Sequence, residues 1–322
     1  MEFQSLKLAQ TAKKVVEICA AVKEGEQVCV VTDTNKLSIA QALAQACAAV
    51  GAETVVCIMA PRKMHGNELP PVVAAAMKAA QCIIAPTTYA PTHTDATKEA
   101  LKAGARIFIL REVTEETFTE GAATADYEEI YQVTSALAQR LSNASQVRMV
   151  TARGTDITLS VKGRQALCLA GLLRGGQRFG GLPSGETAVV PVEGTATGKL
   201  VVDHAIDGIG LLSQPVTLTL RKGKIAKIEG GPQARQLEAI IQGAGKSGRN
   251  VAEFAIGTNP LSRMKGNVAE DKILRGAVHI GIGDSHLIGG KVSSSIHLDM
   301  VVLRPTVWLD GREVVKDGSL VP

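Results

Sequence analysis

The residues best suited to chemistry lie in segment 276–299, where polar side chains interrupt two short apolar runs. His279 and two glycines alternate with Val and Ile in the first run, and His297 and Asp299 alternate with Ile, Leu and Met in the second. Successive side chains of a strand point to opposite faces, so each run has one apolar face and one face that could do chemistry. A metal ion or another cation would account for Asp299, because an unpaired carboxylate is costly to bury. The segment is therefore a candidate metal site.

The two runs are separated by Gly289 and Gly290, a pair typical of a turn. This spacing predicts a hairpin that brings the two polar faces together. His286 lies in the same turn region, seven residues after His279. The glycines beside His279 carry no side chain, so they leave space for a bulky group on the polar face.

Two glutamates in the same half of the chain also lie where packing alone would not require them. Glu253 interrupts an apolar run, and Glu186 follows a Gly/Pro loop at the start of a predicted strand. An ion pair with Arg249 or Arg263 would explain Glu253 equally well, and a solvated loop edge would explain Glu186 alone. The metal interpretation rests on convergence, because three histidines and three carboxylates fall within one half of the chain.

The first half of the chain alternates between short apolar strands and helices. The predicted strands span 27–33, 53–59, 81–86 and 105–110, and the helices include 71–79 and 126–142. Continuous apolar strands between helices favour an α/β domain with a parallel sheet covered on both sides. No G-x-G-x-x-G motif follows the first strand, so a dinucleotide site has no support there.

The pattern changes near residues 142–145, after which alternating strands separated by glycine turns predominate. One helix, at about 233–243, interrupts these strands. We therefore predict an α/β domain over 1–145 and a β-rich α+β domain over 146–322 that binds the metal. An active-site cleft between the two domains is expected.

Composition bounds the class of protein. The chain has 322 residues, 45% hydrophobic and 20% charged, which suits a globular protein with two domains. Its six cysteines form no C-x-x-C pair, which indicates reduced thiols in a cytoplasmic protein. No apolar run is long enough to span a bilayer, and the first ten residues lack the basic-then-apolar pattern of a secretion signal, so neither element is expected. A dispersed net charge of +4 with 3% aromatic residues argues against nucleic-acid binding.

Four short motifs together resemble a known family. L-P-S-G-E, A-E-F-A-I-G-T-N-P, H-I-G-I-G-D and I-H-L-D, at 182–186, 252–260, 279–284 and 296–299, are similar to the M29 metalloaminopeptidases (aminopeptidase T/S). They also resemble the shorter branch of that group, which includes 2,5-dihydroxypyridine 5,6-dioxygenase. The resemblance implies a homodimer and the following metal ligands: Glu186, Glu253, His279, His297 and Asp299.

Two further histidines acquire expected roles from the resemblance. His286 stands where the peptidases have a tyrosine, a departure that weakens the case for peptidase activity. His93 lies in segment 91–100, which is similar to a T-H-T segment that brings a histidine to the site in the dioxygenase branch. The alternative for His93 is a position at a helix start, with Thr92 or Thr94 as the N-cap.

The first functional expectation is a metal-dependent hydrolase of amide-like C–N bonds in a small molecule or short peptide. Zn, Co or Mn, as one ion or two, would be held by the five ligands, with Glu253 or Glu186 bridging or acting as general base. His93 or His286 would donate a proton. The alternative is a ring-cleaving dioxygenase with one Fe(II) held by His279, His297 and Asp299. A metal-free binding protein is the third class, and the survival of all five ligands argues against it.

Overall fold

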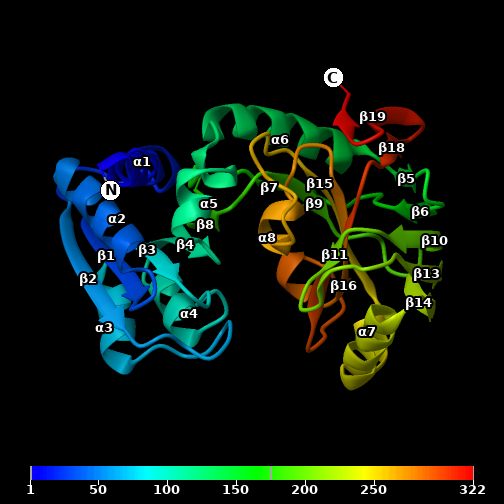
Figure 1. Ribbon diagram of the computed structural model, residues 1–322, viewed down its shortest axis with the longest axis horizontal. Helices are drawn as coiled ribbons and strands as arrows, with labels where there is room; N and C mark the ends of the chain where they lie inside the picture. Colours follow the sequence, from blue (N-terminus) through cyan, green and yellow to red (C-terminus); the bar gives the residue numbers. More distant parts are fainter. Residues whose placement is uncertain (1, 175, 322) are drawn as a thin grey trace. The chain divides into compact units, whose positions relative to one another are not determined.

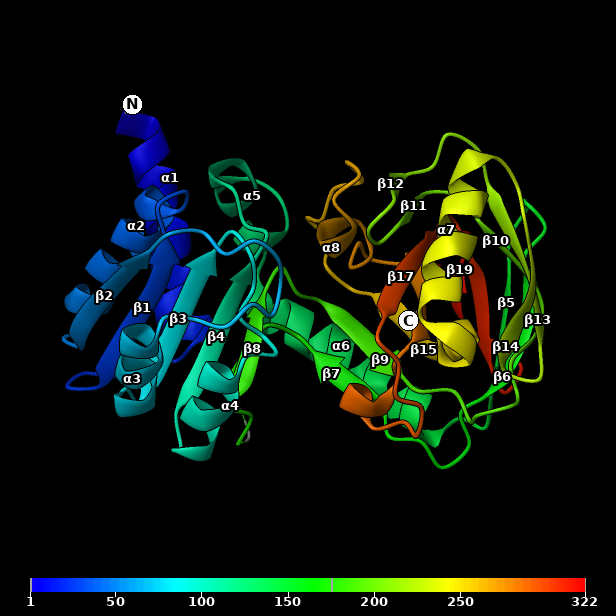
Figure 2. The ribbon, with the colours of Figure 1, turned by 90° about the horizontal axis from the view of Figure 1, so that it is seen from below.

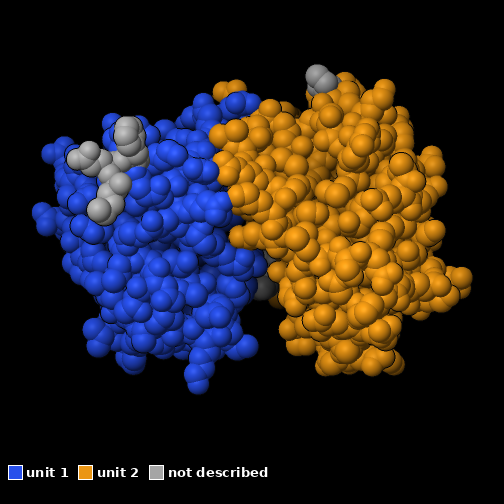
Figure 3. Space-filling model, viewed as in Figure 1, with its two compact units in different colours: residues 1–129, 171–184 blue, residues 130–170, 185–322 orange. Residues whose placement is uncertain are grey.

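The computed structural model describes residues 2–174 and 176–321 and divides into two compact units (Figure 3). Unit 1 comprises Met1–Glu129 and Gly171–Ser184, and unit 2 comprises Ile130–Ala170 and Gly185–Pro322. This division differs from the single boundary predicted after residue 145. Most of the helix α6 (Tyr127–Asn143) belongs to unit 2, and a later segment returns to unit 1 to add a strand.

Unit 1 is built on a parallel sheet of five strands in the order β2-β1-β3-β4-β8. Helices α1, α2 and α5 lie on one face of the sheet, and α3 and α4 lie on the other (Figures 1 and 2). The elements are α1 (Glu2–Lys14), η1 (Val15–Cys19), β1 (Gln27–Asp33), α2 (Leu37–Ala49), β2 (Glu53–Met59), α3 (Pro71–Ala79), β3 (Cys82–Thr87), α4 (Asp95–Lys102), β4 (Arg106–Arg111), α5 (Glu115–Thr119), η2 (Ala122–Thr124) and β8 (Phe179–Leu182).

The strand β8 is one reason why this division differs from the predicted boundary. It pairs with β4 in parallel, although Ile130–Ala170 of unit 2 lie between the two segments of unit 1 in sequence. A side chain at Gly181 is impossible here, because its Cβ would lie 2.1 Å from the carbonyl oxygen of Ile109. Glycine is a weak strand former, so local sequence gives no signal for this pairing.

Unit 2 contains two antiparallel sheets. The eight-stranded sheet consists, in spatial order, of β14 (Lys224–Glu229), β13 (Val216–Arg221), β10 (Thr197–Val202), β6 (Asp156–Ser160), β5 (Gln146–Val150), β18 (Thr306–Leu309), β19 (Arg312–Lys316) and β20 (Ser319–Leu320). The seven-stranded sheet consists of β12 (Gly210–Leu211), β11 (Ala205–Ile206), β17 (His297–Val302), β16 (Val278–Gly283), β15 (Val251–Gly257), β9 (Glu186–Val189) and β7 (Leu167–Leu169). The shorter elements are α7 (Pro232–Gly243), η3 (Gly245–Arg249), α8 (Val268–Asp271) and η4 (His286–Ile288).

The main core of unit 2 joins one face of each sheet. Met149, Leu200 and Leu218 of the larger sheet belong to the same buried cluster as Phe254 and Ile280 of the smaller one. Burial of such side chains is the dominant stabilising term for a sandwich of this kind. The opposite face of the seven-stranded sheet is thus left for polar groups.

The predicted fold class is confirmed: an α/β unit with a parallel sheet accompanies a β-rich α+β unit. The predicted hairpin is present, since β16 and β17 pair antiparallel. The cleft between domains stays a prediction. Within the described ranges, no helix combines the length and the apolar character needed to cross a bilayer.

Candidate metal centre

Four neighbouring strands bring the five predicted ligands to one face of the seven-stranded sheet. In β16, Gly281 pairs with both Glu253 of β15 and Asp299 of β17. Directly paired residues of antiparallel strands share a face, and so do residues two apart on one strand. His279 and His297 therefore lie on the same face as the two carboxylates. Glu186 joins them from β9, where it pairs with Gly257 of β15.

Gly281, at the centre of these side chains, makes room for them. Gly281 carries no side chain, and a Cβ at this position would lie 2.8 Å from the Cβ of Glu253 and 3.1 Å from Cε1 and Nε2 of His297. The His297 imidazole thus occupies the space above Gly281, between the two paired carboxylates. The bulky group for which the glycine leaves space is this ring.

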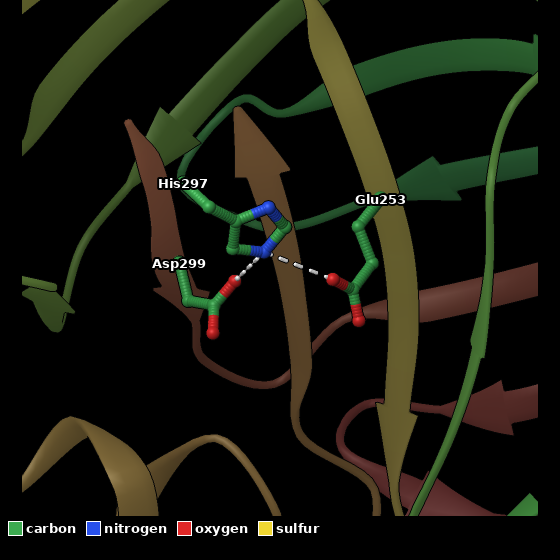
Figure 4. A group of neighbouring side chains, drawn as sticks. All are labelled: Glu253, His297 and Asp299. Atoms are coloured by element: carbon green, nitrogen blue, oxygen red, sulfur yellow. Dashed lines mark ion pairs between the residues drawn. The ribbon is translucent and has the colours of Figure 1, made fainter. Parts of the chain in front are cut away.

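His297 is the centre of the tightest part of the group (Figure 4). Its Nε2 lies 3.1 Å from Oε2 of Glu253 and 3.2 Å from Oδ1 of Asp299. Ligand atoms of these three residues all lie within 4.8 Å of one another. His279 completes the group, with Nε2 at 3.5 Å from Oε1 of Glu253 and 3.9 Å from Oδ1 of Asp299.

A hydrogen bond fixes the orientation of the His297 ring. Its Nδ1 lies 2.7 Å from the carbonyl oxygen of Asp284, which can only accept, so Nδ1 carries the proton and donates. Nε2 is thereby directed at Glu253 and Asp299. A backbone carbonyl that holds the far nitrogen of a ligating histidine is a common feature of metal sites.

Burial and opposite charges shift the pKa values of these groups. Burial opposes ionisation of Glu253, but its close contacts with the imidazoles of His279 and His297 lower its pKa to about 2. Burial likewise opposes protonation of His297, but Asp299 and Glu253 raise its pKa to about 11. The pKa of His279 is raised against its burial by Asp299, and Lys272 and the imidazoles hold the pKa of Asp299 well below its usual range. The group therefore attracts positive charge, whether as protons or as a metal.

Several buried atoms of the group have no hydrogen-bond partner among the residues that the structure describes. They are Oε2 of Glu186, both ring nitrogens of His279 and Oδ1 of Asp299. Buried polar atoms are rarely left unsatisfied, because each costs about 1–3 kcal/mol. Carboxylate oxygens and imidazole nitrogens are the donors that Zn, Mn and Fe(II) accept. The residues present thus fit a divalent metal ion.

Comparison with known proteins agrees with this site and fold. The model of the NicX family, described as 2,5-dihydroxypyridine 5,6-dioxygenase, matches residues 7–322. The chain belongs to the NicX family. No curated protein matches it.

Two solved structures share the fold of this NicX-family chain. The 2,5-dihydroxypyridine dioxygenase of Pseudomonas putida KT2440 superposes with a TM-score of 0.83 at 20% identity, covering 98% of this chain and 97% of that one. Wild-type AmpT from Thermus thermophilus superposes with a TM-score of 0.73 at 14% identity, covering 98% and 99%. The family match over residues 7–322 confirms the dioxygenase branch that the four motifs resemble, and the likeness to AmpT shows a shared fold.

Sequence reasoning missed one residue of the site, Lys272. Its Nζ lies 3.0 Å from Oδ2 of Asp299 and 3.2 Å from Oε1 of Glu186, and its side chain is only 14% exposed. Lys272 directly follows α8, and the charged run Glu270, Asp271 and Lys272 looks like a solvated surface in the sequence. No local signal distinguishes this lysine from an exposed one.

Of the two remaining candidate residues, His286 is not joined to this group and His93 belongs to the other unit. His286 begins η4 and is exposed, and within the described part of the chain no ion pair joins it to the cluster. His93 is an exposed residue of unit 1, just before α4, and Thr94 is the N-cap, with Oγ1 accepting a hydrogen bond from the Thr97 amide. Catalytic roles for both histidines stay predictions, as does the homodimer.

Proposed function

We propose that this chain is a metalloenzyme that opens the ring of a small hydroxylated aromatic substrate with molecular oxygen. A single divalent ion would be held among Glu253, His279, His297 and Asp299. The match to the 2,5-dihydroxypyridine 5,6-dioxygenase family over residues 7–322 supports this reaction class.

The charge of the site is the observation that carries the proposal. Glu186, Glu253 and Asp299 contribute −3 and Lys272 contributes +1, which leaves −2 when both imidazoles are neutral. One divalent ion brings this total to zero. Buried charge without compensation is expensive, so the balance favours one ion beside Lys272.

The donor set and its surroundings suit an oxygenase. Two imidazoles and carboxylates on one face with open positions are typical of non-haem Fe(II) oxygenases, and a bound ion would supply the activation of oxygen next to the substrate. The chain would provide orientation, since Asp284 directs His297 through its Nδ1 proton. Glu186 would hold a proton from a substrate hydroxyl on Oε2, which has no hydrogen-bond partner in the described chain.

Hydrolysis of an amide-like C–N bond is the second candidate, and the number of acidic groups favours it. Glu186 and Glu253 both accompany Asp299 at the site, which is more carboxylate than one ferrous ion requires. The fold shared with AmpT adds support. This reaction would use a pair of Zn, Co or Mn ions that share a hydroxide.

Metal content and oxygen dependence separate the two candidates. The protein would be purified without added metal, loaded anaerobically with Fe(II) and supplied with 2,5-dihydroxypyridine, with oxygen uptake and ring absorbance recorded. We expect about one ion per chain and ¹⁸O from oxygen gas in the ring-opened product. About two ions per chain, together with hydrolysis of aminoacyl anilides under strict anoxia, would contradict the proposal and favour the hydrolase.

A further inference from the structure

Lys272 lies between two carboxylates in the manner of a second cation. The two oxygens of Asp299 contact different cations: Oδ1 lies 3.2 Å from Nε2 of His297, and Oδ2 lies 3.0 Å from Nζ of Lys272. The oxygens of Glu186 are arranged in the same way: Oε1 lies 3.2 Å from Nζ of Lys272, and Oε2 lies 3.8 Å from Nδ1 of His279. Each carboxylate therefore connects the lysine to the imidazole side of the site. Carboxylates that link two cations are characteristic of two-metal centres.

We propose that the Lys272 ammonium takes the position of a second metal ion and keeps the centre to one ion. A metal bound to both Oε1 of Glu186 and Oδ2 of Asp299 would lie about 2.0–2.2 Å from each oxygen. Nζ already lies within 3.2 Å of both. The ion and the ammonium would overlap, so only one of them can be present. The inference rests on the metal site of the proposed function and adds a residue that decides its metal count.

The loop that carries Lys272 is held firmly, so the ammonium does not swing in from solvent. The carboxylate of the preceding residue, Asp271, accepts hydrogen bonds from the amides of Lys265 and Gly266 at 2.9 Å. The same carboxylate lies 2.7 Å from Nε2 of His204, whose side chain is only 11% exposed. Asn267 caps α8 through the Ala269 amide.

The segment that follows Lys272 also packs closely against the seven-stranded sheet. At Gly257 of β15, a Cβ would lie 2.2 Å from the carbonyl oxygen of Leu274 and 2.6 Å from the carbonyl carbon of Ile273. This close backbone approach begins directly after Lys272. Backbone contacts on both sides of the lysine fix its Cα near the polar face, so less side-chain freedom is lost when Nζ meets the carboxylates.

Metal titration of Lys272 variants tests the inference without substrate. Each chain would be stripped, titrated with Co²⁺ and analysed by elemental mass spectrometry and visible absorption. We expect about one ion in the wild type and in Lys272→Arg, and about two in Lys272→Met, a doubling. Lys272→Met combined with Glu186→Gln should return to about one ion, because the second site loses a ligand. Lys227→Met, at an exposed ion pair with Glu229, is the matched control and should match the wild type.

One ion in folded Lys272→Met, or two ions in the wild type, would overturn the inference. If Lys272→Met does not fold, the wild type would be acetylated in the presence of saturating Co²⁺. We then expect one bound ion per chain and no acetyl group on Lys272 in peptide mass spectra. Labelling of Lys272 that appears with a second bound ion would contradict the proposal. Failure of the proposed oxygenase function would be distinguishable from failure of this inference. In that case the variants would show the expected metal counts, but the chain would take up no oxygen.

Discussion

Replacing Gly281 by alanine is expected to weaken metal binding, because the space above this glycine holds the His297 ring. The new Cβ would lie 2.8 Å from the Cβ of Glu253 and 3.1 Å from Nε2 of His297. Real side chains do not approach Cβ to Cβ so closely, and Glu253 Cβ belongs to the paired strand β15 and cannot easily move. We therefore expect the His297 ring to be the group that moves.

The expected loss of metal affinity depends on where the His297 ring can move. Overpacking by one methyl group in a tight site costs about 1–3 kcal/mol. The His297 side chain is 33% exposed, so without metal the ring has room to turn outward and relieve the clash, although it then gives up its hydrogen bond to Asp284. A bound metal requires the ring to face Glu253 and Asp299, so the penalty falls on binding. At 1.4 kcal/mol for each factor of ten, the dissociation constant should rise about 5- to 150-fold.

Competition with a chromophoric chelator for Co²⁺ or Zn²⁺ would measure this change. Gly243→Ala is the control, because the same substitution there meets no atom within 4 Å and Gly243 has no positive φ. The control should bind metal as the wild type does, and both variants should keep the wild-type circular dichroism spectrum. Wild-type affinity in Gly281→Ala would refute the idea that this gap positions His297.

Two further predictions concern protons and thiols. Asp299 and Glu253 raise the pKa of His297 to about 11 against its burial, so the metal-free ring is protonated at neutral pH and metal must displace that proton. Apparent metal affinity should therefore rise about tenfold per pH unit for each displaced proton below about pH 11, and calorimetry in several buffers would count the protons released. Affinity that does not change with pH would contradict this charge arrangement. Burial raises the pKa of Cys19 and Cys82 to about 12, so both thiols should resist iodoacetamide in the native chain and react after unfolding, as read by peptide mass spectrometry.

The strand positions of the site could be predicted because they depend on a local rule. Side chains alternate between faces along any strand, so the positions of His279, His297 and Asp299 between apolar residues already assigned them to one polar face. Pairing of β16 with β17 was predicted from the Gly289-Gly290 pair between them, which is typical of a turn. The strand boundaries of unit 1 were predictable for a similar reason, since a buried parallel strand such as β1 is a continuous apolar run.

What the sequence could not supply depends on contacts between distant segments. The strand β8 joins β4 through backbone that only glycine permits, and no local preference signals it. Lys272 reaches the site because a loop folds back on β15, which no periodicity encodes. The partner of His204, Asp271, lies 67 residues away in sequence. Each of these features becomes visible only when the path of the loops is known.

Lys272 also shows why carboxylates alone do not decide the chemistry of this centre. Two divalent ions with a shared hydroxide would contribute +3 and would neutralise the −3 of Glu186, Glu253 and Asp299 only if the lysine were absent. One divalent ion with the lysine gives the same neutral total. Both states balance, so the choice between them depends on whether the ammonium can leave. Asp271 holds the loop from two backbone amides and from His204, and departure of Lys272 would strain those bonds. The proposed one-ion centre rests on these contacts of Asp271, and the proposed reaction at a single metal rests on them as well.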